Sequence, residues 1–141
     1  MLCVPASIWE EVASHALEVY PEECCGALLG AKDRVERLIR LANSSETDRR
    51  RRYRIDPAEL LDATQQARKL GMDVLTVYHS HPDSEAYFSP EDAANACPWY
   101  RYLVVAVRHG QIRAAKSYQW DAARGSYVEC EFKIESPASA E

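Results

Sequence analysis

The segment that constrains the fold most is a helix with two clear ends, followed almost at once by a strand. Asp56 is a typical N-cap residue and Pro57 suits the first helical position. Gly71 follows the predicted helix 56–70 and is a favourable C-terminal stop. The β-rich stretch 74–78 comes directly after this glycine. A helix that leads straight into an apolar strand is typical of a domain that packs helices against a sheet.

The remaining elements follow the same mixed pattern. Apolar residues recur at helical spacing over 7–20, where Ser7 and Glu10 have the pattern of a capping box. Further strands are predicted over 24–29, 35–41, 102–107, 111–120 and 127–134, a short helix opens at 89–92, and 43–54 and 79–88 are loops. The sequence therefore predicts one α/β domain over 1–135 with a mixed central sheet, and a flexible C-terminal tail over 136–141.

Length and charge exclude several classes of function. A chain of 141 residues suits one ordinary domain and leaves little for a second. The net charge of -5 argues against general binding to nucleic acid, which requires a basic surface. The longest apolar run, 102–107, is far shorter than the roughly 20 residues that a bilayer requires. No signal peptide precedes the acidic pair at 10–11, so we expect a cytoplasmic protein without a membrane partner.

The cysteines indicate no metal knuckle and no redox motif. There are 5 of them, and none forms a C-x-x-C pair. The adjacent Cys24 and Cys25 lie on a predicted strand and should point to opposite faces. We expect all of the cysteines to be reduced and structural.

Two histidines and an aspartate carry the strongest chemical signal. His79 and His81 are two residues apart at the end of the predicted strand, so their imidazoles lie on one face. Asp92 follows in the first turn of a short helix, and the intervening loop is long enough to bring its carboxylate to the same point. Two imidazoles and one carboxylate leave a fourth zinc position open, as in a catalytic site. Each residue also has a simpler interpretation, since Ser89 and Asp92 suit the start of any helix.

The full pattern resembles the signature of the JAMM/MPN-plus zinc metalloproteases. It consists of His79-x-His81 followed by Pro82, then Ser89, with ten residues between the second histidine and Asp92. The upstream acidic block 21–26, Pro-Glu-Glu-Cys-Cys-Gly, resembles the block that precedes the first core strand of that family. One departure is Phe88, since many family members have proline directly before the serine.

The resemblance implies a cytidine-deaminase-like α/β/α fold and hydrolysis of peptide or isopeptide bonds. It implies that His79, His81 and Asp92 bind Zn²⁺, that Glu23 is the catalytic acid and base, and that Ser89 donates a hydrogen bond to the tetrahedral intermediate. The chain lacks room for the family's second insertion, because only 97–101 separate the short helix from the next strand. It therefore resembles the compact prokaryotic members, whose substrates are ubiquitin-like sulfur-carrier proteins or their conjugates.

Two rival functions can be compared with the metalloprotease interpretation. A zinc deaminase requires H-x-E and P-C-x-x-C, and the chain has neither. A catalytically inactive MPN-type scaffold that only binds partners would be expected to lack ligands that are present here. The arginine-rich run 49–54 is either a solvated loop or a basic segment that steers an acidic carrier protein toward the site.

Overall fold

The computed structural model describes residues 1–136 of the chain. The predicted tail 136–141 lies outside the described residues, apart from Ser136. In chain order the elements are β1 (Leu2–Pro5), α1 (Ala6–Val19), β2 (Cys25–Ala31), β3 (Arg34–Leu41), α2 (Pro57–Lys69), β4 (Asp73–Pro82), α3 (Pro90–Ala94), β5 (Arg101–Arg108), β6 (Gln111–Asp121), β7 (Ser126–Cys130) and β8 (Phe132–Glu135).

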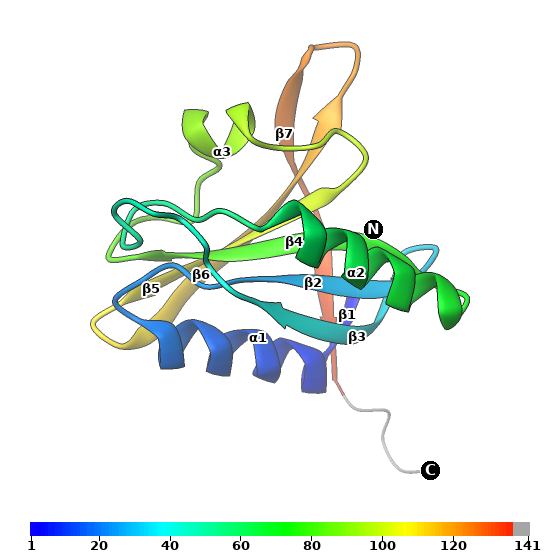
Figure 1. The fold of residues 1–141 in the computed structure, drawn as a ribbon, viewed down its shortest axis with the longest axis horizontal. Helices are drawn as coiled ribbons and strands as arrows, with labels where there is room; N and C mark the ends of the chain where they lie inside the picture. Colours follow the sequence, from blue (N-terminus) through cyan, green and yellow to red (C-terminus); the bar gives the residue numbers. More distant parts are fainter. Residues whose placement is uncertain (137–141) are drawn as a thin grey trace.

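The strands form a single mixed sheet with a helix on each face. Their order is β7-β6-β5-β4-β2-β3-β1-β8. The central strand β4 is antiparallel to β2 and parallel to β5. Helix α1 covers one face and α2 the other, and Figure 1 shows the two helices on opposite sides of the strands. The predicted mixed α/β fold is confirmed, and no helix within 1–136 has the length and apolar character needed to cross a membrane.

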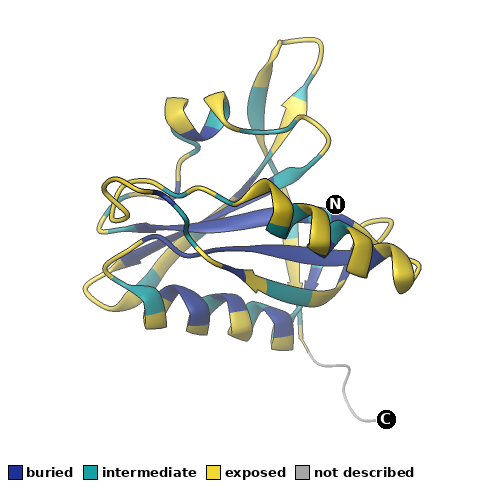
Figure 2. Cartoon of the chain, viewed as in Figure 1, coloured by how far each residue is buried: buried dark blue, intermediate teal, exposed yellow. Residues whose placement is uncertain are grey.

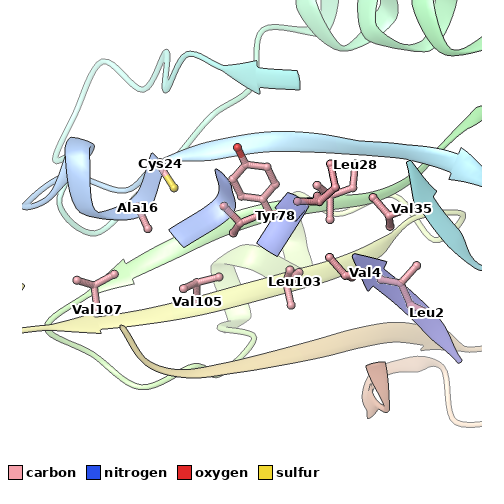
Figure 3. Close-up of a cluster of buried hydrophobic side chains, with 12 residues drawn as sticks. Leu2, Val4, Ala16, Cys24, Leu28, Val35, Tyr78, Leu103, Val105 and Val107 are labelled. Atoms are coloured by element: carbon pink, nitrogen blue, oxygen red, sulfur yellow. The ribbon is translucent and has the colours of Figure 1, made fainter. Parts of the chain in front are cut away.

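Each face of the sheet has its own apolar core. The core under α1 contains Val12, Leu28 and Tyr78, and Figure 3 shows Tyr78 among aliphatic side chains from several strands. The core under α2 contains Ala63 and Val77. In Figure 2 the central strands are buried, whereas the outward surfaces of both helices are exposed. The sheet is therefore covered on both sides, which holds the central strand β4 in a fixed position.

The two cysteines at the start of β2 separate as the strand geometry predicts. Cys24 belongs to the core under α1, and Cys25 belongs to the core under α2. All cysteines of the chain lie within the described residues and have free thiols. Burial raises the pKa of Cys24 to about 11, so this thiol stays protonated at neutral pH.

The end of the chain differs from the predicted single strand 127–134. Strand β7 pairs with β6, whereas β8 pairs with β1 at the opposite edge of the sheet. Only Glu131 separates the two strands, and in Figure 1 the chain runs on from β7 directly into the red strand β8. The prediction of one strand was wrong because alternation along a strand does not reveal that its pairing partner changes midway.

The N-terminal helix also begins differently from the prediction. Strand β1 runs directly into α1, with Pro5 at the N-cap and no side-chain hydrogen bond to the cap. Ser7 lies inside the first turn, so the predicted capping box of Ser7 and Glu10 is absent. Four residues were too short a stretch for the sequence pattern to identify β1.

Gly26 is required by a buried aromatic side chain. It lies opposite Tyr78 in the β2–β4 ladder, and a Cβ at this position would come within 2.4 Å of the Tyr78 ring. The ring has no room to move, because Tyr78 is fully buried and its hydroxyl lies 2.7 Å from Nδ1 of the buried His15. His15 is thus a core residue that holds Tyr78.

We expect Gly26→Ala to lower the free energy of unfolding by roughly 1–3 kcal/mol, because the added methyl group overpacks a rigid core. Gly71→Ala is the matched control, since Gly71 has a φ of +73° but open space around it. Its cost should be only about 1 kcal/mol, from backbone strain alone. Urea denaturation of the three proteins measures both effects, and equal losses would show that Tyr78 yields to the new methyl group.

Candidate metal centre

His79 and His81 lie inside the central strand. Strand β4 extends from Asp73 to Pro82, so it is longer than the predicted 74–78. His79 pairs with Cys25 of β2, and both histidines also pair with β5. Both side chains are buried, with exposed fractions of 0% for His79 and 5% for His81. The regular strand therefore fixes two imidazoles on one face, as the two-residue spacing predicts.

Asp92 reaches the histidines from the short helix α3. Ser89 is its N-cap residue, and its Oγ accepts a hydrogen bond of 3.0 Å from the Asp92 backbone N–H. The Asp92 carboxylate accepts one of 3.1 Å from the Ser89 backbone N–H, which completes a capping box. This box sets the orientation of the Asp92 side chain, so the helix start and the metal centre depend on the same two residues.

Three donor atoms converge on one point. His79 Nε2, His81 Nε2 and Asp92 Oδ2 are separated by 3.1, 3.1 and 3.2 Å. Burial alone would raise the pKa of Asp92, but the close contacts with His79 and His81 hold it far below its usual value. Burial lowers the pKa of His79 and therefore favours its neutral form. A carboxylate and a neutral imidazole are the protonation states that a metal ion requires.

The donor set fits a zinc ion. Nδ1 of His81 lies 2.8 Å from the carbonyl oxygen of Glu85, which can only accept a hydrogen bond. Nδ1 therefore carries the proton, and in the neutral ring the lone pair of Nε2 faces His79 and Asp92. Zinc bonds of about 2.0–2.1 Å in a tetrahedron place ligand atoms roughly 3.3 Å apart, close to the observed spacing. Lone pairs this close together repel one another unless a cation lies among them.

Glu23 is a second carboxylate beside the same histidines. Its carboxylate oxygen and one nitrogen of each histidine lie within 4.8 Å of one another. Ser80 holds the adjoining chain in place, because its Oγ accepts a hydrogen bond of 2.8 Å from the Cys24 backbone N–H. The Glu23 side chain is 3% exposed, and its Oε1 has no hydrogen-bond partner among the described residues. By contrast, Glu22 is exposed.

Burial raises the pKa of Glu23 to about 9, and the negative charge of Asp92 adds to this effect. Glu23 also lies within reach of a metal, but Asp92 is in direct contact with both imidazoles and already has the lower pKa. The geometry therefore favours Asp92 as the ligand and leaves Glu23 as a poorly solvated carboxyl group next to the centre. A carboxyl group in such a place is suited to proton transfer.

Tyr53 was not identified from the sequence and forms one wall of the centre. Its ring stacks on His79 with centroids 4.3 Å apart and an angle of 21° between the planes. Burial raises the pKa of Tyr53 well above its usual value, so its hydroxyl remains protonated. The contact restricts rotation of the His79 ring and keeps water from one of its faces. Tyr53 lies in a polar loop far from the histidines in sequence, where no periodic pattern marks it.

Asn43 was also missed and ties the arginine-rich loop 43–54 to Glu23. Its Nδ2 donates hydrogen bonds to the carbonyl oxygens of Glu23 and Arg52, at 3.1 and 2.9 Å. Its Oδ1 accepts from the backbone N–H groups of Ser45 and Arg54. One side chain therefore organises both ends of the loop and the backbone beside Glu23. The loop, which was predicted to be only exposed, is in part a fixed wall of the site.

A cavity of about 500 Å³ opens onto the centre. Its lining residues are Pro21, Glu23, Arg50, Arg51, His81, Pro82, Asp83, Ser84, Tyr87 and Ser89. It therefore brings Glu23 and Ser89 together with one of the three donor residues. The volume lies within the range of small-molecule and peptide sites in proteins.

Ser89 caps α3, and one variant tests whether it also has the predicted role of an oxyanion donor. Because its Oγ accepts the cap hydrogen bond from Asp92, its own hydroxyl hydrogen is free to donate into the cavity. We expect Ser89→Ala to lower stability by about 0.5–2 kcal/mol through the lost cap. We expect it to lower turnover by roughly 10²–10³ if the hydroxyl steadies an oxyanion.

Thermal melting and turnover, measured on the same preparations of Ser89→Ala, give the answer. Asp56→Ala is the matched control, because Asp56 caps α2 through a hydrogen bond of 2.9 Å to the Ala58 N–H, away from the cavity. A Ser89→Ala protein that melts earlier but turns over normally would restrict Ser89 to capping.

The sequence and the fold match known proteins. The family model described as prokaryotic homologues of the JAB domain matches residues 5–122. A probable TtuB-protein conjugate cleaving protease of Thermus thermophilus is 36% identical over 96 residues, which cover 68% of this chain and 64% of that protein. A CysO-cysteine peptidase of Mycobacterium tuberculosis is 30% identical over 122 residues, covering 84% of this chain and 82% of the peptidase.

A solved structure matches nearly the whole chain. The solution structure of protein DSY2949 from Desulfitobacterium hafniense superimposes with a TM-score of 0.83 and 28% sequence identity. The superposition covers 99% of this chain and 96% of that one. The match with the Thermus protein spans less than two thirds of its length, whereas the match with DSY2949 is almost complete.

Proposed function

This chain belongs to the prokaryotic homologues of the JAB domain, and from that premise we propose that it is a zinc-dependent peptidase. Its proposed substrate is an amide bond that follows the C-terminus of a ubiquitin-like or sulfur-carrier protein. The names of two relatives support cleavage of a protein conjugate, since one is a probable TtuB-protein conjugate cleaving protease and the other is a CysO-cysteine peptidase. The free thiols agree with a reducing compartment, and we place the reaction in the cytoplasm.

One observation carries the proposal. Three metal-donor atoms lie 3.1–3.2 Å apart, next to a buried carboxyl group without a partner and a hydroxyl group that is free to donate. His79, His81 and Asp92 would hold the zinc ion. When bound, the ion acts as a Lewis acid and lowers the pKa of water to about 7. A site with only three protein ligands is typical of catalytic rather than structural zinc.

Glu23 supplies the proton transfers. Its Oε1 lies in a dry part of the site, where a carboxylate is a stronger base than in water. It accepts a proton from the attacking water and delivers it to the nitrogen of the leaving amine. Asn43 holds the Glu23 backbone, which keeps the carboxyl group beside the histidines.

Ser89 and Tyr53 have supporting roles. The Ser89 hydroxyl donates to the carbonyl oxygen of the scissile bond as negative charge develops there. Tyr53 packs against His79, which excludes water from the ring and preserves its orientation. Neither role requires a residue to move from its position in the structure.

The alternative is a catalytically inactive scaffold of the MPN type. Such a protein has no need for a buried carboxyl group beside three converging donors, because a buried group without a partner costs stability. A binding surface would also place its key residues on the exterior, whereas the three donor residues and Glu23 are buried. The site therefore favours catalysis.

A cleavage assay on three substrates tests the proposal. A ubiquitin-like protein that ends in Gly-Gly is prepared with an extra C-terminal amino acid, with a lysine isopeptide bond, and with an ordinary internal peptide bond as a control. Zinc-loaded protein should shorten one of the first two to the Gly-Gly terminus, as followed by intact mass. Glu23→Gln is the matched inactive protein, and absence of cleavage by wild type on all three substrates would refute the proposed function.

A further inference from the structure

The cavity beside the metal centre is lined in part by two exposed arginines that the proposed hydrolysis does not use. Arg50 and Arg51 line it together with Glu23, His81 and Ser89. Guanidinium groups bind carboxylates through paired, charge-assisted hydrogen bonds. The cavity therefore offers an anion-binding wall within the space that opens onto the reacting atoms.

Four consecutive arginines of the loop, at 49–52, differ in the partners of their side chains. Arg49 donates through Nε to the Ser45 carbonyl oxygen at 2.8 Å, and Arg52 lies 3.3 Å from the Glu91 carboxylate. Within residues 1–136, Arg50 has no carboxylate within 4.0 Å, and Arg51 has only a long contact of 3.9 Å with Asp48. Arg50 and Arg51 therefore line the cavity without a close carboxylate partner of their own.

The backbone that presents these two side chains is fixed. The Glu23 N–H donates to the Arg49 carbonyl oxygen at 2.7 Å, and the N–H groups of Arg51 and Arg52 both donate to the Asp48 carbonyl oxygen at 3.0 Å. The loop is therefore attached to the residue that transfers protons. A subsite on this loop therefore keeps a fixed position relative to Glu23.

Asp83 is the other acidic side chain at this cavity. The Tyr20 hydroxyl lies within 2.8 and 2.7 Å of its two carboxylate oxygens and is its hydrogen-bond donor. This donor keeps the Asp83 charge in place and partly compensates it. The lining therefore has a cationic part at Arg50 and Arg51 and a negative charge at Asp83, so that an anion is favoured on the side of the arginines.

We propose that Arg50 and Arg51 form a subsite for the α-carboxylate of the leaving group, which directs the enzyme to a terminal amino acid attached after the carrier. This inference rests on the proposed function and deepens it. Hydrolysis consumes one water, breaks the C–N bond and forms a C–O bond. The carrier keeps a carboxylate, and the amino acid leaves with the proton on its amine.

The position of the carboxylate distinguishes the two classes of leaving group. In an α-linked amino acid, the carboxylate is separated from the scissile nitrogen by a single carbon, so it lies in the same cavity. In a lysine isopeptide, the scissile nitrogen ends a flexible four-carbon stem and has no charge beside it. The arginine pair therefore favours release of an amino acid over release of a lysine side chain.

Binding to metal-free protein tests the subsite without catalysis and without a metal that could itself bind a carboxylate. The probes are Gly-Gly-Ala with a free carboxylate and the same tripeptide as its C-terminal amide. The free acid should shift the Nε–H signals of Arg50 and Arg51 in NMR spectra, and it should bind roughly tenfold or more tightly than the amide. The double variant Arg50→Gln/Arg51→Gln should lose this preference. The matched control Arg113→Gln/Arg124→Gln removes the same charge from exposed positions on and after β6 and should keep it.

Equal binding of acid and amide, no binding of either, or an unchanged preference in the Arg50/Arg51 variant would each overturn the subsite.

A second experiment compares cleavage of a carrier that ends in Gly-Gly-Ala with cleavage of its C-terminal amide. Wild type should cleave the free acid at least about tenfold faster, and the double variant should cleave both at similar rates. Equal cleavage by wild type would overturn the subsite but keep the peptidase. Cleavage of neither, with binding intact, would refute the peptidase and keep the subsite.

Discussion

Glu23→Gln is expected to bind zinc at the wild-type level and to lose roughly 10²–10⁴ in turnover. The amide keeps the shape of the side chain in its buried position but cannot accept a proton. Glu22→Gln is the matched control, because Glu22 is the adjacent residue and is exposed. Metal content and cleavage rate measured on both proteins decide the question. If Glu23→Gln were active and Glu22→Gln inactive, the proton transfer would belong to Glu22 and the assignment to Glu23 would be wrong.

Glu23→Gln, which should lower turnover, should raise the stability of the metal-free protein. The pKa of Glu23 is raised from 4.5 to about 9 in the folded state. A raised pKa means that the folded state binds the proton more tightly, so its contribution to stability is complete below pH 4.5 and is lost as the pH rises to about 9. We therefore expect Glu23→Gln to stabilise the metal-free protein at pH 7, by at most about 3 kcal/mol. Its advantage should vanish near pH 4 in urea denaturation experiments, and an advantage independent of pH would contradict this explanation.

His81→Ala should abolish zinc binding. The substitution removes one of three donor atoms and leaves Asp92 and His79 unable to complete the site. After dialysis, wild type should retain about one zinc ion per chain and the variant close to none. Cleavage should fall with the metal, since all of the proposed chemistry depends on it.

His109→Ala is the matched control for this experiment. His109 lies in the exposed turn between β5 and β6, is not one of the three donor residues, and has a positive φ of 53°. Its replacement should leave the zinc content unchanged. Equal zinc in wild type and His81→Ala would contradict the ligand assignment.

The sequence predicted the elements that have a regular period or a clear boundary. The helix at 56–70 was anticipated from its cap and its glycine stop, and the structure places α2 at Pro57–Lys69. The predictions that were wrong concern strand length and strand pairing, which depend on distant parts of the chain rather than on the local sequence. Strand β1 is too short to show a period, and the change of partner between β7 and β8 leaves no trace in the alternation of residues.

The site was predictable to the extent that its residues are fixed by strand and helix geometry. His79 and His81 share a face because they are two apart in a strand, and Asp92 is oriented by the capping box of a recognisable helix start. Asn43 and Tyr53 belong to a loop whose path depends on hydrogen bonds to distant backbone. No local pattern in the sequence indicates such contacts.

The most direct test of the account is the dependence of cleavage on zinc. Protein stripped with a chelator is titrated with zinc, and release of the C-terminal amino acid from a Gly-Gly carrier is followed by mass. The account predicts that metal-free protein is inactive and that cleavage rises to a plateau at about one zinc ion per chain. Full cleavage by the metal-free protein, or no cleavage after one equivalent of zinc is bound, would contradict it.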